Sequence, residues 1–322
     1  MSHYLFTAAS ITTLALLSAS VSAQPYPNRP IRIVVPGTAG SANDFTARAI
    51  SQRLTDAWGQ QIVIDNRAGA GGVIAHEIVA RANPDGYTLI FSTSAGLVIN
   101  PLLFKTPYDP FRDFAPVSLG SINPQMLFAH PAVAANSVAE LITLARAKPG
   151  ALNCASAGTG TPNHLGCELL KSLGGINFVH VPYKGSGGGV TDVVGGQMHF
   201  MFNSIPAVLP LVKAGKLKAL GVGGPKRSPV APEVPAIAET LPGFEVVNWY
   251  AMLAPAGTAA PIINKINAEM VKMIADPPFA QRLLEMGSEP LSSTPAGLAA
   301  HMRKESDRWS KVIKAAGIKI ER

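Results

Sequence analysis

The chain has 322 residues, of which 47% are hydrophobic, so it is long enough to bury a large core divided between two lobes. The formal net charge of +7 comes from Lys and Arg residues scattered along the chain without a long basic run. Because no basic stripe is interleaved with aromatic residues, we expect no nucleic-acid partner. The charge then serves either solubility or mild steering of acidic small molecules.

The N-terminal segment predicts export from the cytoplasm. Residues 5–17 form an apolar stretch, and Val21, Ser22 and Ala23 satisfy the small-residue rule for signal cleavage. No Lys or Arg precedes the apolar stretch, which is unusual for a signal peptide. No later segment offers the roughly 20 apolar residues that a membrane-spanning helix needs. We therefore expect residues 1–23 to be a signal peptide, cleaved after Ala23, and the mature chain to be a soluble periplasmic protein.

The first half of the chain alternates short strand patterns with helical patterns. Residues 31–35 are a continuous apolar run typical of a buried strand, and the following helix carries an apolar stripe that ends at Gly59. This alternation predicts a parallel sheet with helices on its faces. The expected elements are a strand at 31–35, a helix up to Trp58, a strand at 62–64, a glycine turn at 66–72, a helix that ends near Arg81, and a strand at 87–91.

An irregular segment separates the two halves. Residues 101–114 are rich in Pro and aromatic residues without a clear period, so we expect an ordered surface connection there. Strand–helix units resume after it, which indicates a second α/β lobe. The expected elements are strands at 117–120, 126–129, 152–155, 178–181, 199–202, 217–222 and 246–254, and helices at 137–148, 165–173, 189–194, 205–214, 260–274, 278–286 and 295–316.

A Gly/Thr-rich turn at residues 158–165 joins a short strand to a helix in the second half. Its glycines allow a tight turn that presents backbone N–H groups, Thr161 suits the N-cap and Pro162 suits the first helical position. Such a turn is either purely structural or a site for an anion such as a carboxylate. No Gly-Lys-Ser/Thr follows, as a phosphate-binding loop would need, and no Gly-x-Ser-x-Gly motif is present.

A similar glycine loop opens the first helix of the first half, at residues 36–44. In open α/β sheets, ligands lie beyond the carboxyl ends of strands, near helix N-termini. Two lobes that face each other with such loops would form a cleft with hydrogen-bond donors on both walls. The candidate ligand-binding residues of the two loops are Gly37, Thr38, Ala39, Gly40, Ser41, Asn43, Asp44, Gly158, Thr159, Gly160, Thr161 and His164.

Other candidates stand at strand ends. Lys184 is the best candidate for a charged contact, with a solvated side chain as the alternative. Asp44 either benefits from the helix dipole or holds a loop N–H group or a water, and His164 donates either to the ligand or to the loop. We expect Asp192 to support the loop at Tyr183 or to cap a helix. The strand-end candidates are Ser92, Thr93, Ser94, Tyr183, Lys184, Asn203 and Ser204.

The chain contains two cysteines, Cys154 and Cys167, on either side of the Gly158 turn. In an oxidising compartment they could form a disulfide that clamps the base of the loop. We expect two free buried thiols, with the disulfide as the alternative.

Signals for enzymatic chemistry are weak. His76-Glu77 begins like a zinc-protease motif, but Ala80 occupies the position of the second histidine. The seven His and two Cys residues show no metal-binding spacing. A Ser/His hydrolase lacks an exposed-nucleophile motif, although catalytic triads are spatial and spacing alone does not exclude one. We expect no catalytic residues, no metal and no cofactor.

The order and spacing of many short motifs resemble the periplasmic solute-binding proteins of the tripartite tricarboxylate transporter family, also called Bug proteins. The resemblance covers essentially the whole mature chain. The residues that carry it are 30–36 (PIRIVVP) with Asp44, 66–72 (NRAGAGG), 84–89 (PDGYTL), 100–101 (NP), 107–110 (PYDP), 113–117 (DFAPV), 158–165 (GTGTPNHL), 181–185 (VPYKG), Asp192 with 195–197 (GGQ), and 249–250 (WY) with 254–258 (APAGT).

The resemblance implies a two-lobed periplasmic binding protein fold of type II. Each lobe would be a mainly parallel sheet flanked by helices, with the ligand cleft between the lobes. Residues 24–122 and 245–322 would form the first lobe, and residues 123–244 the second. The two glycine loops would grip one carboxylate of the ligand through backbone N–H groups, hydroxyls and water.

The resemblance also implies a monomer that captures a di- or tricarboxylate, an amino acid or an aromatic acid. It would deliver this ligand to a separate inner-membrane permease. A ligand sensor that signals to a membrane partner is the alternative, followed by a periplasmic hydrolase. The sequence departs from the family pattern at Gly37, where an aromatic residue is usual, and at residues 39–41 and 187–189. Loss of the aromatic side chain leaves the identity of the ligand open.

Overall fold

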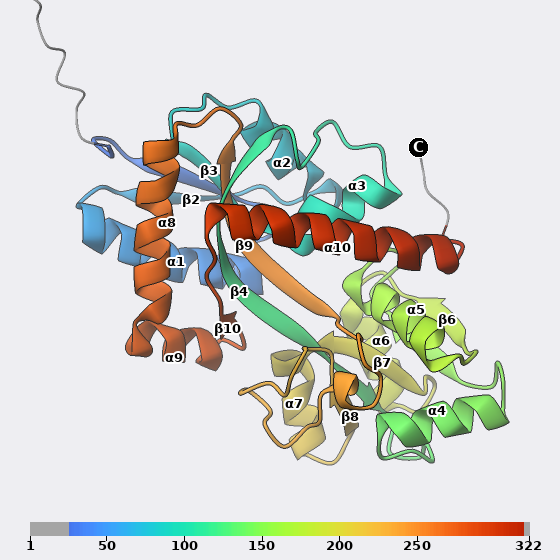
Figure 1. Cartoon of the computed structure of the whole chain (residues 1–322). Coiled ribbons are helices and arrows are strands. Elements are labelled where there is room, and N and C mark those ends of the chain that lie inside the picture. The colour runs from blue at the N-terminus through green and yellow to red at the C-terminus, as the bar shows by residue number, and fades with distance from the viewer. Residues whose placement is uncertain (1–25, 319–322) are drawn as a thin grey trace, which may run out of the picture.

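The computed structural model describes residues 26–318, so the predicted signal peptide and its cleavage site after Ala23 lie outside the described residues. The protein is a mixed α/β molecule with two lobes that share one curled sheet (Figure 1). Within residues 26–318, no helix is both long and apolar enough to cross a membrane.

The first lobe is built on three parallel strands in the order β2-β1-β3. Their apolar side chains alternate between two faces: Ile31 and Ile33 of β1 pack with α1, α8 and α9, whereas Val34 packs with α2 and α10. The sheet is therefore buried on both faces, as its continuous apolar runs predict. The elements are β1 (Ile31–Val35), α1 (Ala42–Trp58), β2 (Ile62–Asn66), α2 (Val73–Ala80), β3 (Thr88–Thr93), α8 (Ala260–Ala275), α9 (Pro277–Glu285) and α10 (Pro295–Ala315).

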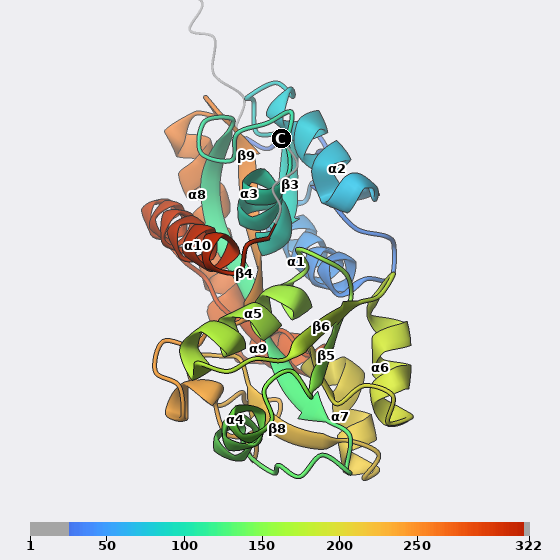
Figure 2. The ribbon, with the colours of Figure 1, turned by 90° about the vertical axis from the view of Figure 1, so that its right-hand side faces the viewer.

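The second lobe repeats the plan with three parallel strands in the order β7-β5-β6. A compact apolar core that includes Phe128, Met201 and Val208 fills one side of this sheet. The elements are α4 (Val138–Ala147), β5 (Asn153–Ser156), α5 (Pro162–Gly174), β6 (Val179–Pro182), α6 (Ser186–Val194), β7 (Phe200–Ser204), α7 (Ile205–Lys213) and β8 (Lys218–Val222). Figure 2 shows this lobe below the first, with α5 facing α3 (Asn100–Leu103).

Two strands connect the lobes. The prediction of separate strands at 117–120 and 126–129 is wrong, because β4 (Phe114–Ala129) is one continuous strand of 16 residues. Its first part pairs with β9 (Val247–Pro255), and its last part pairs with β7 and β8. β9 also pairs with β3, so the crossing strands continue the sheet of the first lobe into the second. The polar residues between Ser121 and Gln125 conceal this continuity in the sequence.

Three further features differ from the sequence-based expectations. The segment expected to be irregular at 101–114 begins inside a helical stretch, η2 (Ala95–Ile99) followed by α3 (Asn100–Leu103). A two-residue strand, β10 (Glu289–Pro290), pairs with β4 and was not predicted. Finally, α10 extends across both lobes, contacting β4 and also α5 of the second lobe (Figures 1 and 2).

Candidate functional site

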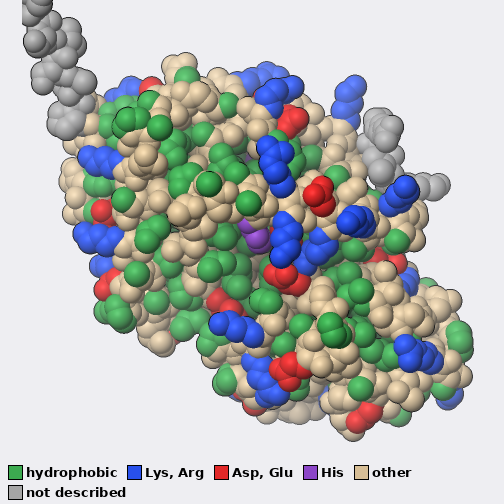
Figure 3. All heavy atoms as spheres, in the orientation of Figure 1, with side chains coloured by type: hydrophobic (Ala, Val, Ile, Leu, Met, Phe, Trp, Pro, Cys, Tyr) green, Lys and Arg blue, Asp and Glu red, His purple; other side chains and the backbone are tan. Residues whose placement is uncertain are grey.

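A cavity of about 360 Å³ lies between the two lobes. The outline of the molecule narrows between the larger and the smaller lobe (Figure 3). The polar residues that line the cavity come mainly from the crossing strands and the end of β7: Asn123, Gln125, Ser204, Asn248 and Tyr250. The apolar residues come from the start of α1, the start of α7 and the end of α9: Ala42, Phe45, Pro206, Ala207 and Met286.

Loop 1, residues 37–41, leads from β1 into α1 and toward this cavity. Ser41 is the N-cap of α1, and its Oγ accepts a hydrogen bond from the N–H of Asp44 at 3.3 Å. Asp44 is 1% exposed and accepts from the Gly40 N–H at 2.9 Å, from Arg48 Nε at 3.0 Å and from Asn66 Nδ2 at 3.0 Å. Its carboxylate therefore holds loop 1 in shape, which is one of the two roles expected for it.

The charge state of Asp44 follows from these contacts. Burial alone would raise the pKa of this carboxyl group, but hydrogen bonds from Arg48, Gly40 and Asn66, together with the charge of Arg48, keep the pKa below its ordinary value. Asp44 is thus ionised at neutral pH and saturated with donors, so it has little capacity left for a ligand.

Loop 1 offers unused backbone donors. Among residues 26–318, the N–H groups of Thr38, Ala39 and Asn43 have no hydrogen-bond partner. Thr38 and Ala39 are exposed, whereas Asn43 is buried at the start of α1. The side chain of Asn43 donates to Phe91 O at 3.1 Å, and its Oδ1 is buried without a partner among the described residues. These donors stand at the positive end of a 17-residue helix, where an anion is favoured.

Loop 2, residues 157–161, makes the equivalent turn into α5. Thr161 is the N-cap and Pro162 the first helical residue, as predicted. The Thr161 hydroxyl donates to Gly158 O at 2.6 Å and accepts from the His164 N–H at 3.4 Å. Gly158 and Gly160 have φ angles of 133° and 78°, which disfavour residues with a side chain. Within the part of the chain that the structure describes, the exposed N–H of Thr159 has no partner.

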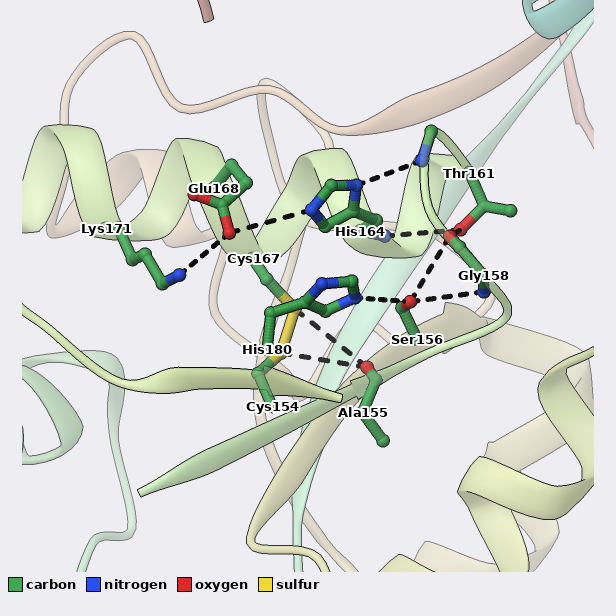
Figure 4. A network of polar contacts seen from close by, with 11 residues as sticks. Cys154, Ala155, Ser156, Gly158, Thr161, His164, Cys167, Glu168, Lys171 and His180 are labelled. Carbon is green, nitrogen blue, oxygen red and sulfur yellow. Dashed lines mark hydrogen bonds and ion pairs between the residues drawn. A yellow bond between two sulfur atoms is a disulfide. The ribbon is translucent and has the colours of Figure 1, made fainter. Parts of the chain in front are cut away.

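His164 lies beneath loop 2. Its Nδ1 accepts a hydrogen bond from the Gly160 N–H at 3.0 Å, and its Nε2 lies 3.7 Å from Glu168 Oε1. The ring stacks on His180 with 3.9 Å between ring centroids (Figure 4). Burial and the charge of Lys171 lower its pKa to about 4, so the ring is neutral at pH 7. His164 therefore supports the loop as an acceptor, whereas the sequence suggested a donor.

A disulfide between Cys154 and Cys167 closes the base of loop 2, so the prediction of free thiols is wrong. β5 and α5 pack side by side and place the two Cα atoms 6.6 Å apart, within the range that a disulfide spans. This distance depends on the packing of the strand against the helix, which the sequence separation does not reveal. Next to the bridge, Ser156 Oγ lies 2.6 Å from His180 Nε2 and accepts from the Gly158 N–H at 3.2 Å (Figure 4).

The strand-end candidates divide into two groups. Ser92 is fully buried and bonded to His76 Nε2 at 2.6 Å, so it faces the core. Ser94 is also buried, but its hydroxyl donates to Asn248 Oδ1 at 2.7 Å and so supports a residue of the cavity wall. Thr93, between them, is half-buried and accepts from the Gly96 N–H at 3.3 Å.

The Ser92–His76 pair does not form a hydrolytic site. The His76 ring is fully buried, and its Nδ1 lies 2.8 Å from Gly72 O, so Nδ1 carries the proton and Nε2 accepts from Ser92. Burial lowers the pKa of His76 to about 4. No carboxylate completes the pair among the described contacts, and neither side chain reaches solvent. In residues 26–318, no group of three or more His, Cys, Asp or Glu residues could hold a metal ion.

The remaining candidates lie in the second lobe. The Tyr183 hydroxyl donates to Asp192 Oδ2 at 2.5 Å, which confirms that Asp192 supports this loop. Lys184 is exposed. Asn203 accepts from the Ser204 N–H at 2.8 Å, and Ser204 is the N-cap of α7 and lines the cavity.

Of the ten residues that line the cavity, the sequence-based candidates included only Ser204. The polar residues that sequence reasoning missed are Tyr250, Asn123, Gln125 and Asn248. The last three are amides inside otherwise apolar strands, and that pattern is the signal that could have identified them. Gln125 also links the cavity to loop 2, because its Oε1 accepts from Asn163 Nδ2 at 3.3 Å in the first turn of α5. Asn163 Nδ2 donates to Phe202 O as well, at 2.5 Å.

Comparisons with known proteins agree on one family. Residues 46–318 match the family model described as the tripartite tricarboxylate transporter family receptor, TctC. A protein from Pseudomonas sp. strain P51, described as a UPF0065 protein in the tcbD-tcbE intergenic region, is 40% identical over 93% of this chain and 91% of its own length. The protein BugT of Bordetella pertussis is 35% identical over 95% of this chain and 94% of its own length.

Solved structures show the same similarity. A protein of R. palustris, whose structure was solved with adipate, is 37% identical, with a TM-score of 0.78 over 91% of this chain and 99% of the solved chain. MatC from Rhodopseudomonas palustris, solved with bound malate, is 34% identical, with a TM-score of 0.72 over 89% of this chain and 100% of the solved chain.

Proposed function

Since this chain belongs to the tripartite tricarboxylate transporter family of receptors, we propose that it captures a small carboxylate between its lobes and delivers it to a membrane permease. The observation that carries the proposal is the pair of glycine loops at helix N-termini, one in each lobe, near a cavity that residues of both lobes line. Loop 1 runs into Ala42 of the cavity wall, and Asn163, just after loop 2, donates a hydrogen bond to Gln125 of the wall. The adipate and malate bound by the two R. palustris proteins support a carboxylate as the ligand.

We assign the grip on one carboxylate to the unused donors of the two loops. Thr38, Ala39 and Asn43 of loop 1 and Thr159 of loop 2 have free N–H groups in the described part of the chain. The hydroxyls of Thr38 and Ser41 can add further donors, and Gly37 and Gly40 keep loop 1 open to the ligand. A hydrogen bond to a charged group contributes about 1.5–3 kcal/mol, so a few such bonds hold a carboxylate without a Lys or Arg side chain.

Several residues predicted to bind the ligand do not contact it in this proposal but support the structure around it. Asp44 shapes loop 1, His164 and Thr161 shape loop 2, and Ser92 belongs to the core. Lys184 remains a proposed approach to the charged end of the ligand, because it is exposed beside loop 2 and carries the positive charge that a carboxylate prefers.

Ligand capture would close one lobe onto the other by a hinge motion of β4 and β9. We propose that residues 24–122 and 245–322 move as one body and residues 123–244 as the other. These limits place the hinge next to Asn123 and Gln125, which line the cavity, so closure would change the cavity directly. We further propose a monomer that performs no catalysis.

Export is part of the same proposal. The solved relatives include one described as a periplasmic transporter, 35% identical to this chain. A cleaved signal peptide ending at Ala23 would bring this chain to the same compartment, where the Cys154–Cys167 bridge is stable. N-terminal sequencing of the exported protein should begin at Gln24.

Calorimetric titration with a panel of carboxylates tests the function. We expect saturable binding of at least one small carboxylate at a stoichiometry of one per chain, without turnover. Deletion of the gene should abolish uptake of that carboxylate. Turnover that disappears on Ser or His substitution would replace the receptor by a hydrolase, whereas intact uptake with a lost transcriptional response would indicate a sensor.

A further inference from the structure

A groove of about 760 Å³ lies between α5 of the second lobe and α10 of the first lobe. Leu169, Ser172 and Leu173 line it from α5, and six residues from Lys304 to Ala315 line it from the C-terminal half of α10. Figure 1 shows α10 passing above α5. The groove shares no lining residue with the 360 Å³ cavity, so it is a separate surface. We call it the α5–α10 groove.

One face of α10 carries the basic side chains of the groove. Lys304, Arg308 and Lys311 follow at spacings of four and three residues, which places them on the same side of the helix. Arg308 is already paired, at 2.8 Å from Glu305 and 3.4 Å from Glu245. Lys304 and Lys311 are exposed, and within residues 26–318 neither makes an ion pair. Figure 3 shows Lys and Arg side chains gathered over α10. Two unpaired positive charges therefore stand on this wall.

The rest of the lining is mainly apolar. Leu173 is 41% exposed on α5, whereas Leu169 and Val312 are nearly buried. Asp307 is the one acidic residue among the ten that line the groove, against three basic residues. A matching partner surface would pair carboxylates with the lysines and an apolar side chain with Leu173, because interfaces combine an apolar core with a complementary charged rim.

The shape and composition of the groove select the kind of partner. A lipid bilayer presents a broad surface that does not enter a concave groove between two helices. None of the ten lining residues is aromatic, so nucleic-acid bases would find no stacking platform. A second copy of this chain, with a net charge of +7, would meet the lysines with charge of the same sign. An acidic protein segment with an apolar side chain fits the groove in shape, chemistry and charge.

Helix α5 connects the α5–α10 groove to loop 2. The helix begins at Pro162, directly after loop 2, and Leu169, Ser172 and Leu173 lie in its second half. Its 13 residues form a rod of about 20 Å, so a shift of loop 2 moves the groove wall with it. Since the facing wall belongs to α10, a rotation of one lobe against the other changes the width of the groove. Ligand capture and the groove are therefore mechanically linked.

We propose that the α5–α10 groove docks an acidic segment of the permease, and that it does so preferentially after the lobes have closed on a ligand. Carboxylates of that segment lie beside Lys304 and Lys311, and an apolar side chain packs on Leu173. The groove thereby reports to the permease whether the receptor is loaded. This inference rests on the proposed function, because that function supplies the permease as the partner.

Photo-cross-linking tests the contact and its dependence on the ligand. Ser172→p-benzoylphenylalanine places a photoreactive side chain in the groove. The mature protein is irradiated with membranes that contain the permease, with and without a carboxylate that calorimetry has shown to bind. We expect a cross-link to an acidic permease segment, with a yield about fivefold or more higher in the presence of the ligand. Ala214→p-benzoylphenylalanine, at an exposed position after α7, is the matched control and should give no cross-link. No cross-link from the groove, a cross-link to a segment without acidic residues, or equal yields with and without ligand overturns the inference.

Charge reversal tests the two lysines. The Lys304→Glu, Lys311→Glu double variant should lower uptake of the same carboxylate about tenfold in spheroplasts that lack their own receptor, because like charges replace the two ion pairs with the permease. Its affinity for the carboxylate in calorimetry should not change. Lys213→Glu, Lys216→Glu is the matched control, with two exposed lysines that likewise make no ion pair in residues 26–318, and should leave uptake unchanged. Leu173→Ser, which keeps every charge, should lower uptake as well.

The outcomes separate this inference from the proposed function. Wild-type uptake in the Lys304→Glu, Lys311→Glu variant, or an equal loss in its control, overturns the inference while the receptor function stands. Absence of binding by every carboxylate overturns the receptor function itself, and binding without uptake by the wild-type protein overturns delivery to a permease. If the double variant loses binding to phosphatidylglycerol vesicles that contain no permease, the groove binds lipid and the inference is overturned. The melting temperature of each variant confirms that it is folded.

Discussion

The two glycine loops make the same turn but are supported in opposite ways. Loop 1 rests on an ionised carboxylate, Asp44, that gathers a backbone N–H, Arg48 and Asn66. Loop 2 rests on the neutral His164 ring, stacked on His180, and on a disulfide. Each support leaves backbone N–H groups free for an anion. The comparison shows that the shape of such a loop can be fixed by charge or by covalent and stacking contacts, and the two supports should fail under different conditions.

Reduction of the disulfide should have the largest effect and should act on loop 2 alone. The bridge closes a loop with a sequence separation of 13, for which chain-entropy arguments give a stabilisation of about 3 kcal/mol. Urea unfolding with and without reductant measures the difference, and a Cys154→Ala, Cys167→Ala double variant is the control for reagent effects. A reduced protein that unfolds at the same urea concentration would show that the bridge does not support the loop.

Asp44→Ala should have the next largest effect and should act on loop 1 alone. The substitution removes three hydrogen bonds, one of them from the charged Arg48 side chain, at a cost of about 2 kcal/mol in unfolding free energy. Ligand affinity should fall as well, because the Gly40 turn loses its anchor. Asp56→Ala, on the exposed face of α1, is the matched control and should stay near wild type. Unchanged ligand affinity in Asp44→Ala would separate the support from the grip.

Gly160→Val tests the shape of loop 2 without touching its polar supports. The φ angle of 78° is unfavourable for valine, and a Cβ atom at this position would lie 2.5 Å from Leu103 Cδ1 of the first lobe. We expect ligand affinity to fall about tenfold or more, equivalent to about 1.4 kcal/mol, with the fold retained. Gly150→Val is the control, because Gly150 has the same φ angle of 78° but no atom within 4 Å of the added Cβ. Equal affinity losses in both variants would contradict a specific role for loop 2.

Mild acid should have the smallest effect on stability, and it should weaken the support of loop 2 but not that of loop 1. The pKa of His164 and of His180 is lowered to about 4 by burial, whereas an unfolded histidine titrates near 6.5. Between about pH 6.5 and pH 4, these histidines bind protons in the unfolded chain but not in the folded chain. The free energy of unfolding therefore falls as the pH drops through this range. Asp44 stays ionised throughout that window, because its pKa lies below its ordinary value.

Urea unfolding of the ligand-free protein at pH 7 and pH 5 measures this dependence. A His164→Gln, His180→Gln double variant should show a smaller loss than the wild type. Some loss should remain, since burial also lowers the pKa of His76 to about 4. An identical pH dependence in both proteins would assign the effect to histidines elsewhere.

The sequence predicted the helices and strands whose ends are set by residues a few positions away. The helix up to Trp58 ends at Gly59 in a left-handed conformation, and Thr161 caps α5, because stripes, caps and glycines act within a few residues. The continuity of β4 was not predictable in this way. Four of the five residues 121–125 are polar or Pro inside a strand, and two of them, Asn123 and Gln125, line the cavity between the lobes.

The sequence indicated where the two glycine loops lie, but not the contacts of their individual atoms. The two glycine loops could be identified from their spacing, but the role of His164 as an acceptor depends on the position of the Gly160 N–H in the folded turn. Likewise, the disulfide depends on the packing of β5 against α5, and the exposure of Gln125 to the cavity depends on pairing between distant strands. These are tertiary contacts, which no local pattern encodes.

The continuous strand β4 has a consequence for the integrity of the molecule. Since its first part pairs with β9 and its last part with β7 and β8, a cut near Pro124 would leave both halves with open strand edges. Open edges invite pairing with other chains and aggregation. We therefore expect that neither lobe folds on its own and that the molecule melts in one cooperative transition. The flexibility that ligand capture needs then comes from bending a hydrogen-bonded ribbon, which returns elastically to its starting shape when the ligand leaves.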